Sequence, residues 1–305
     1  MHSPLFLPPA PAHFFDQVFK GSGGAQNHTI IWGSKAQGDA TQAGIVKHAA
    51  SEGALVWVIG QSDEYLARFD STLHAADWVH LAPDTPANIN IFDSSSPAYS
   101  LEDALPEAVA HLCCSLGVSD KVGVKAVQAE LELVGPDQLS FRALALLTDE
   151  MREYEGQKVS RFAGLARTLS WYADAGRDAY RGWKLDGKLT DIERAQAVRL
   201  ALLRIFAQIA QSEVSRPKLI CIEDASWLTH LQNGSMVDRK HFDFIERLLR
   251  RGRKANAVLL ASQLSQNLAL AEKTTKRMNP LVSRYIHFPC QITKKDLLRW
   301  NHLSL

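Results

Sequence analysis

The chain has 305 residues, and its 34 lysines and arginines against 33 aspartates and glutamates leave a formal net charge of +1. This balance excludes a polybasic nucleic-acid coat protein and a strongly acidic tail protein. With 46% hydrophobic and 22% charged residues, the sequence is typical of a globular protein with one large domain or a domain that carries an insertion.

The spacing of the cysteines and the length of the apolar runs indicate the cellular compartment. Cys113 and Cys114 are adjacent, and none of the four cysteines has the spacing of a zinc site or a disulfide framework, so we expect a reducing environment and no metal. No apolar run approaches the ~20 residues that a membrane span needs. The proline-rich residues 1–15 lack the basic region of a signal peptide. The sequence therefore predicts a cytoplasmic protein.

The N-terminal part is predicted to be a parallel α/β unit that follows a flexible segment, residues 1–24. Apolar runs bounded by glycine predict buried strands, and a run of helix formers that stops at Gly53 predicts the helix between them. In chain order we expect a strand, a helix, a strand and a weaker strand at residues 28–32, 37–52, 54–59 and 78–81. This first part of the core should span residues 1–99.

The pattern changes to a helical period between residues 100 and 212, which predicts a mainly helical insertion interrupted by the aromatic, glycine-bearing segment 171–187. Strand patterns return in residues 213–305, the second part of the core. We expect these strands at residues 218–222, 257–261 and 284–288. Polar residues follow the strands at their carboxyl ends, where open parallel sheets place their ligand sites.

The segment after the first strand has the glycine spacing of a phosphate loop, in which backbone N–H groups surround phosphates. Asp39 stands where the loop lysine should be, and Ala40 stands where a hydroxyl should bind magnesium. Exchanging a cation for an anion about 4 Å from a phosphate turns an attraction of about 4 kcal/mol into a repulsion of that order. An ordinary strand-to-helix turn also explains this spacing. The candidate residues of a degenerate nucleotide site are Gly33, Ser34, Lys35, Gly38, Asp39 and Ala40.

Two later strand ends carry candidate catalytic residues. Glu223 and Asp224 follow a buried strand in the inverse order of a Walker B pair, so neither carboxylate has the length that phosphoryl transfer requires at its position. The pair could instead cap the helix that follows. Gln263, after the next strand, is a candidate γ-phosphate sensor, although a strand-end glutamine is commonly a loop residue. We expect low activity from this set.

A basic cluster lies between these strands. Arginine forks suit an interface with a neighbouring subunit or an acidic partner, whereas basic residues before Gly252 also complement a helix dipole. The candidate interface residues are Arg250, Arg251, Arg253 and Lys254. A net charge of +1 without a further basic stripe gives no strong nucleic-acid signal.

Taken in order, these segments resemble the C-terminal motor domain of the VirB/TrbE/TraC-type ATPases of conjugative type IV secretion. The resemblance covers nearly the whole chain, and its strength is the family order of the segments rather than any single one. The segments that carry it are His28–Gly33, Asn88–Asp93, Leu165–Trp171 with Leu185–Gly187, Glu223–Trp227, Arg253–Asn256, Ser262–Gln263 and His287–Cys290.

The resemblance implies a RecA-like α/β motor core with a helical insertion, of the HerA/FtsK kind, working as a ring at the cytoplasmic face of the inner membrane. Two departures from the family are the altered phosphate loop and the expected lack of its large N-terminal docking domain. Our leading hypothesis is a pseudo-ATPase that needs no cofactor and assembles with itself, an intact secretion ATPase or a channel component. The alternatives are an active divergent ATPase that uses Lys35 with ATP and magnesium, and a HerA-like DNA-handling ring.

Overall fold

The structure is a computed structural model that describes residues 28–74, 78–82, 125, 181–228, 246, 248–250, 255–264 and 282–287. Several expectations lie outside these residues: the flexible segment 1–24, nearly all of the helical insertion before residue 181, and Arg251, Arg253 and Lys254 of the basic cluster. The same holds for the Asn88–Asp93 and Leu165–Trp171 segments of the family resemblance.

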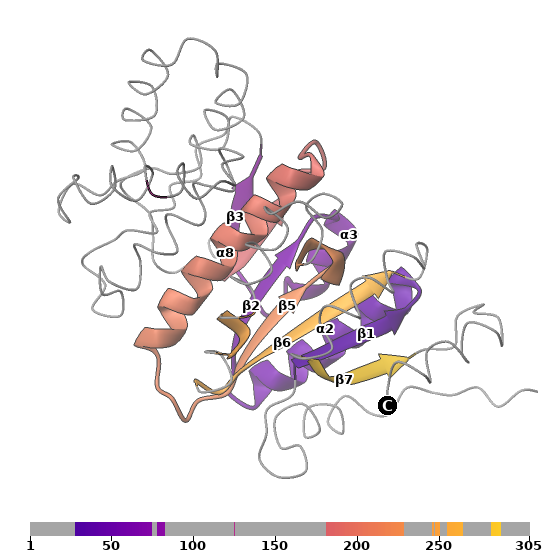
Figure 1. The fold of residues 1–305 in the computed structure, drawn as a ribbon. Helices are drawn as coiled ribbons and strands as arrows, with labels where there is room; N and C mark the ends of the chain where they lie inside the picture. Colours follow the sequence, from indigo (N-terminus) through magenta and orange to yellow (C-terminus); the bar gives the residue numbers. More distant parts are fainter. Residues whose placement is uncertain are drawn as a thin grey trace, which may run out of the picture.

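The core is a single sheet of seven strands in the order β3-β4-β2-β5-β6-β1-β7, and every neighbouring pair runs parallel (Figure 1). Parallel strands point their carboxyl ends to the same edge, so all the loops that follow them meet there. The strands are β1 (His28–Gly33), β2 (Leu55–Gly60), β3 (Trp78–Leu81), β4 (Gly182–Leu185), β5 (Lys218–Ile222), β6 (Ala257–Leu264) and β7 (Val282–His287).

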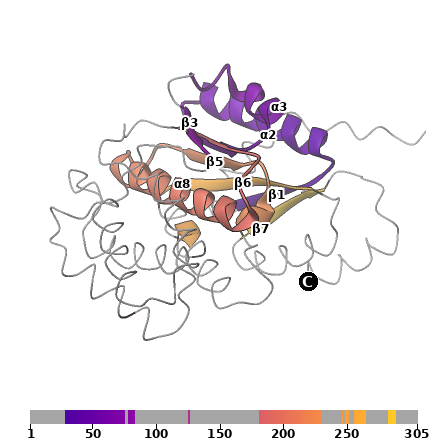
Figure 2. The same cartoon turned by 90° about the horizontal axis from the view of Figure 1, so that it is seen from above.

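Helices cover both faces of the sheet. Figure 2 shows α2 (Lys35–Ser51) and α3 (Asp63–Leu66) on one face and α8 (Asp191–Gln211) on the other. Because side chains alternate along a strand, Val56 and Val58 of β2 face the core under α2, and Trp57 between them faces α8. There the Trp57 Nε1 donates to Gln208 Oε1 of α8 at 2.5 Å. None of the described helices combines the length and the apolar character that crossing a membrane requires.

The core beneath α2 and α3 is apolar. It takes alternate residues from the central strands and the inward face of the two helices, together with the short 3₁₀ helix η1 (Ala67–Phe69). Its fully buried members include Ile31, Ile45, Val46, Val58, Tyr65, Phe69, Leu219, Cys221, Val258 and Leu260. Burial of this size gives the sheet a rigid frame, on which the strand-end side chains are held in place.

The amino end of β5 is held by a buried lysine. Lys218 is fully buried, and its Nζ donates to two carbonyls of the loop 213–216 at 2.6 and 2.8 Å and to the Ala255 carbonyl at 2.9 Å. Asn256 has a left-handed backbone with φ of 57°, and its Nδ2 donates to the Ser215 carbonyl at 2.9 Å. Asn256, from the Arg-Lys-x-Asn segment of the sequence, therefore holds the turn into β6.

The six strands predicted from apolar runs are confirmed, with β6 three residues longer than expected. The bounds expected for the insertion, residues 100–212, extend too far, because Gly182–Leu185 in its interrupting segment forms β4 between β3 and β2. Helix α8 follows β4 directly and covers the sheet, so residues 182–212 belong to the core and not to the insertion. The first helix also begins two residues earlier than expected, at Lys35.

Candidate functional site

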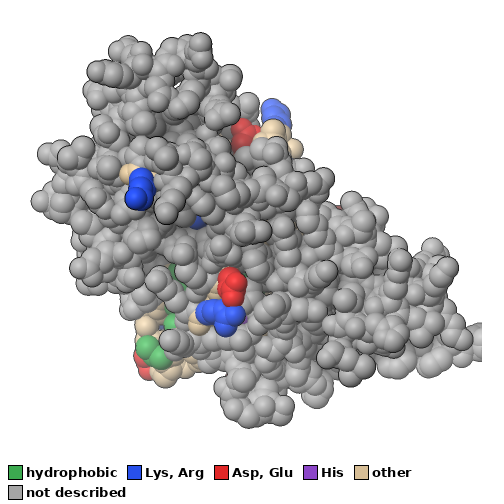
Figure 3. Space-filling view, viewed as in Figure 1, with side chains coloured by type: hydrophobic (Ala, Val, Ile, Leu, Met, Phe, Trp, Pro, Cys, Tyr) green, Lys and Arg blue, Asp and Glu red, His purple; other side chains and the backbone are tan. Residues whose placement is uncertain are grey.

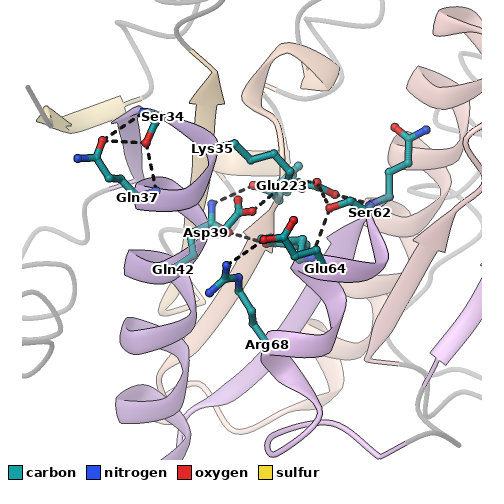
Figure 4. Close-up of polar contacts among 12 residues, drawn as sticks. Ser34, Lys35, Gln37, Asp39, Gln42, Ser62, Glu64, Arg68 and Glu223 are labelled. Atoms are coloured by element: carbon teal, nitrogen blue, oxygen red, sulfur yellow. Dashed lines mark hydrogen bonds and ion pairs between the residues drawn. The ribbon is translucent and has the colours of Figure 1, made fainter. Parts of the chain in front are cut away.

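Polar groups from three segments of the chain meet at the carboxyl edge of the sheet. Lys35 and Asp39 come from the first turns of α2, Glu223 follows β5, and Gln61 and Ser62 connect β2 to α3. Figure 4 shows Lys35 and Asp39 reaching from α2 toward Glu223, with Ser62 on the opposite side of that carboxylate. The sequence predicted Lys35, Asp39 and Glu223 for one site, and the fold brings them together.

The segment between β1 and α2 does not form a phosphate loop. Gly33 ends the strand, Ser34 is the N-cap of α2, and Lys35 is already helical. Ser34 and Gln37 form a capping box, in which the Ser34 Oγ accepts the Gln37 N–H at 3.4 Å and Gln37 Oε1 accepts the Ser34 N–H at 3.3 Å. The Gly38 N–H donates to the Ser34 carbonyl at 3.0 Å. These N–H groups are used inside the helix start, which corrects the expected loop from Gly33 to Thr41.

Gly38 has a packing role. A Cβ placed on this residue would lie 2.8 Å from Ser262 Oγ, so α2 approaches β6 at a distance that only glycine allows. Ala40, at the position of the missing hydroxyl, is exposed on the helix. The two-glycine spacing therefore reflects a strand end and a close helix contact in this chain.

Lys35 is bound by two carboxylates. Its Nζ lies 2.5 Å from Glu223 Oε1 and 3.0 Å from Asp39 Oδ2, and 5.6 Å from the centre of the Tyr65 ring. The lysine side chain is 34% exposed, whereas those of Asp39 and Glu223 are 1% and 7% exposed. Partial burial alone would lower the pKa of Lys35, but its hydrogen bonds and charge attraction to the two carboxylates outweigh burial and raise it.

Glu223 is satisfied on both oxygens. Oε1 accepts from Lys35 and from Ser62 Oγ at 2.6 Å, and Oε2 accepts the Gln61 N–H at 2.5 Å and the Ser62 N–H at 3.0 Å. Burial alone would raise the pKa of Glu223, but these donors prefer the ionised form and lower it below its ordinary value. Glu223 is therefore a buried, ionised carboxylate.

Asp39 is less well satisfied. Its Oδ2 is paired with Lys35, but its buried Oδ1 has no hydrogen-bond partner in the structure as described. Burial raises the pKa of this carboxyl, and the nearby Lys35 only partly opposes the rise. The buried Ser262 Oγ next to Gly38 is likewise unpartnered among the described groups.

Asp224 has a different structural role from Glu223. Its Oδ1 accepts the Ser226 N–H at 2.8 Å at the start of the 3₁₀ helix η4 (Ala225–Leu228), and burial raises its pKa. The capping interpretation thus describes Asp224, while Glu223 faces the lysine. Gln263 lies at the carboxyl end of β6, opposite Trp32 of β1. Arg250 is exposed and pairs with Glu246 of the same helical segment, with Nη2 2.6 Å from Oε1.

Four residues of the site were not predicted from the sequence. Gln61 and Ser62 supply three of the donors to Glu223, and a buried chain lies beneath them: Tyr65 Oη donates to Gln42 Oε1 at 2.5 Å, and Gln42 Nε2 donates to the Ile222 carbonyl at 3.0 Å. A signal for Gln61 and Ser62 was present, because they follow an apolar strand run just as Glu223 does.

These residues do not fit magnesium-bound ATP in the way that a phosphate loop holds it. The expected cradle of N–H groups is a capped helix start, the lysine is bound to carboxylates, and position 40 carries no hydroxyl. Within the described ranges, no group of three or more His, Cys, Asp or Glu side chains is placed to hold a metal ion.

Two solved structures share this fold. VirB4 of Thermoanaerobacter pseudethanolicus has a TM-score of 0.65 at 13% sequence identity, over 91% of this chain and 80% of that chain. The plasmid coupling protein TrwB, in complex with the non-hydrolysable ATP analogue ADPNP, has a TM-score of 0.51 at 12% identity, over 91% of this chain and 74% of that chain. No family model and no curated protein matches the sequence. At these identities the likeness establishes the fold, and the predicted RecA-like α/β class is confirmed.

Proposed function

We propose that this chain is a component of a type IV secretion or conjugation apparatus that does not hydrolyse ATP. It would serve as an assembly or regulatory subunit beside an intact secretion ATPase, at the cytoplasmic face of the inner membrane. The fold that it shares with VirB4 and with TrwB supports the choice of system. The geometry at the carboxyl edge of the sheet supports the loss of hydrolysis.

The observation that carries the proposal is that Lys35 is already paired with two carboxylates. Its Nζ is bound to Glu223 and Asp39, which take two of its three N–H donors, so a phosphate that engaged this ammonium fully would have to displace both carboxylates. Breaking these pairs leaves buried carboxylates without their cation. Removing one partner of a buried ion pair costs about 3–5 kcal/mol of stability. One lysine between two carboxylates also leaves a local charge of −1 when all three are ionised, which repels a polyphosphate.

Calorimetric titration of the full chain with ATP and magnesium tests this proposal. We expect no binding heat and no hydrolysis above buffer, in the wild type and equally in Lys35→Ala. A magnesium-dependent hydrolysis rate that Lys35→Ala abolishes would contradict the proposal. That result would establish the second candidate, an active divergent ATPase, which the convergence of Lys35 with Glu223 at one strand edge favours.

The partner surface in this proposal is the basic cluster of Arg250, Arg251, Arg253 and Lys254. Arg250 is exposed and its pairing with Glu246 leaves it at the surface, where a carboxylate of a partner can compete for the guanidinium. We expect Arg250→Ala to weaken self-association or co-purification with the cognate secretion ATPase without changing the melting temperature. Arg68→Ala is the matched control, because Arg68 pairs with Glu64 at the same i,i+4 spacing. Equal effects of both variants would remove the cluster from the proposal.

The DNA-handling alternative has less support from the described surface. In two places on the face in Figure 3 an acidic side chain lies beside a basic one, and the described residues there form no basic patch. Sequence-independent binding to DNA needs several aligned cations that each neutralise a phosphate. Retention of duplex DNA at moderate salt by the purified chain would reopen this alternative.

A further inference from the structure

The groups around Glu223 form a cradle for an oxyanion. Four donors converge on its two oxygens: Lys35 Nζ from α2, the N–H groups of Gln61 and Ser62, and the Ser62 hydroxyl. They come from two segments of the chain, and the carboxylate arrives from a third, at the end of β5. Each donor lies between 2.5 and 3.0 Å from an oxygen, so the cradle already holds an anion of the shape of a carboxylate.

We propose that Glu223 is an autoinhibitory ligand, a carboxylate supplied by the chain itself that fills an oxyanion site between α2 and the β2–α3 connection and keeps external anions out. Fixed N–H groups, a hydroxyl and an ammonium are the donor set that proteins use to bind oxyanions. The inference deepens the proposed function, because it explains what closes this edge of the sheet. It needs only the geometry of the cradle, so it does not depend on the partner or on the secretion system.

The ligand that would replace Glu223 is a small monovalent carboxylate such as formate or acetate. Once the Glu223 charge is removed, Lys35 contributes +1 and Asp39 contributes −1 beside the vacated position, so the site has no excess positive charge for a phosphate dianion. Lys35 gives solvent access to the cradle, because its side chain is 34% exposed.

The test is thermal melting of Glu223→Ala in the full chain with sodium formate or sodium chloride at equal ionic strength. We expect formate at about 0.3 M to raise the melting temperature of the variant by about 2 °C relative to chloride, as a weak ligand of the native state would. The wild type should show no such difference. Glu193→Ala is the matched control, since Glu193 is also buried and accepts an N–H and a hydroxyl, from Thr190, at the start of α8. An equal formate effect in Glu193→Ala or in the wild type would overturn the proposal.

One further arm decides the matter even if Glu223→Ala does not fold. Glu223→Gln keeps the shape of the side chain but replaces one carboxylate oxygen by an NH2 group. That group cannot accept the hydrogen bonds that the oxygen accepts in the wild type. We expect this variant to melt about 2–5 °C below the wild type and to ignore formate, because the amide still fills the cradle. A wild-type melting temperature for Glu223→Gln would overturn the proposal. A phosphate effect larger than the formate effect in Glu223→Ala would overturn the monovalent assignment.

These arms also separate this inference from the proposed function. Binding of ATP by the wild type would refute the loss of nucleotide binding while leaving the formate response of Glu223→Ala to be judged on its own. Absence of that response, with no ATP binding by the wild type, would refute the cradle and leave the proposed function standing.

Discussion

Lys35→Met removes the cation that joins α2 to the end of β5 while keeping an unbranched side chain beside the Tyr65 ring. Two carboxylates then stay in place with fewer donors: Glu223 keeps three, and Asp39 loses the partner of its Oδ2. A charge pair at about 4 Å is worth about 4 kcal/mol at an effective dielectric of 20. Because Lys35 is 34% exposed, solvent screens part of this attraction, and we expect a loss of about 2–3 kcal/mol in the free energy of unfolding.

Urea denaturation of the wild type and Lys35→Met near neutral pH measures this loss, with Lys47→Met as the control at an exposed lysine of the same helix. Lys47→Met should stay within about 0.5 kcal/mol of the wild type, as surface substitutions usually do. If Lys35→Met is equally neutral, the ion pairs do not hold the site closed, and the physical basis of the proposed loss of nucleotide binding is wrong.

The pH dependence of the difference between wild type and Lys35→Met gives a second measurement. The lowered pKa of Glu223 means that its contribution is present above the ordinary value of 4.5 and is lost as the pH falls through the folded-state pKa. The raised pKa of Lys35 means that its contribution is present below 10.5 and is lost as the pH rises through the folded-state pKa. The stability difference should therefore be largest between about pH 5 and about pH 10 and shrink on both sides. The raised pKa of Asp39 acts oppositely, since its burial becomes less costly as the pH falls.

Three further predictions concern the frame of the site. Gly38→Ala should lower the free energy of unfolding by about 1–3 kcal/mol through its contact with Ser262 Oγ, and Ser262→Ala in the same chain should restore part of the loss in urea denaturation. Asn256→Ala should melt lower than Asn256→Gly, because a φ of 57° suits glycine and opposes alanine by about 1 kcal/mol. Asp39→Lys with Ala40→Thr should give no thermal shift with ATP, because the N–H groups of the helix start remain capped; a clear shift would show that the helix start can reopen as a loop.

The strands were predictable because burial on both faces of a parallel sheet requires continuous apolar runs. The runs of β2, β5 and β6 are of this kind, and their positions were predicted within a few residues. β4 was missed because its four residues, Gly182–Leu185, include a glycine and a lysine and form no apolar run. Its place is set by long-range pairing with Trp78–Leu81 and Val58–Gly60, which a local pattern does not report.

The start of α2 shows how two local signals competed. Ser34 and Gln37 have the spacing of a capping box, which predicts a helix from Lys35, while Gly33 and Gly38 have the spacing of a phosphate loop. The capping box prevailed, because its side chains satisfy the first N–H groups of the helix without any ligand. The sequence contained both signals, and the capping contacts of Ser34 and Gln37 together with the packing of Gly38 on Ser262 distinguish them in the fold.

The contact between Lys35 and Glu223 joins residues 188 positions apart, and it bears on two of the three functional hypotheses that the sequence left open. In the hypothesis of an active ATPase, Lys35 would bind a phosphate and Glu223 would serve magnesium. In the pseudo-ATPase hypothesis, the same two residues belong to a site that does not bind nucleotide. A lysine that serves a phosphate must keep its charge available, whereas here each of its carboxylate partners is less than 10% exposed and its own pKa is raised by them. The three charges at this edge sum to −1 and the two carboxylates are buried, so exchange of either for an external anion is costly. Asp39, which stands where a phosphate loop has its lysine, is therefore one of the two carboxylates that pair with Lys35.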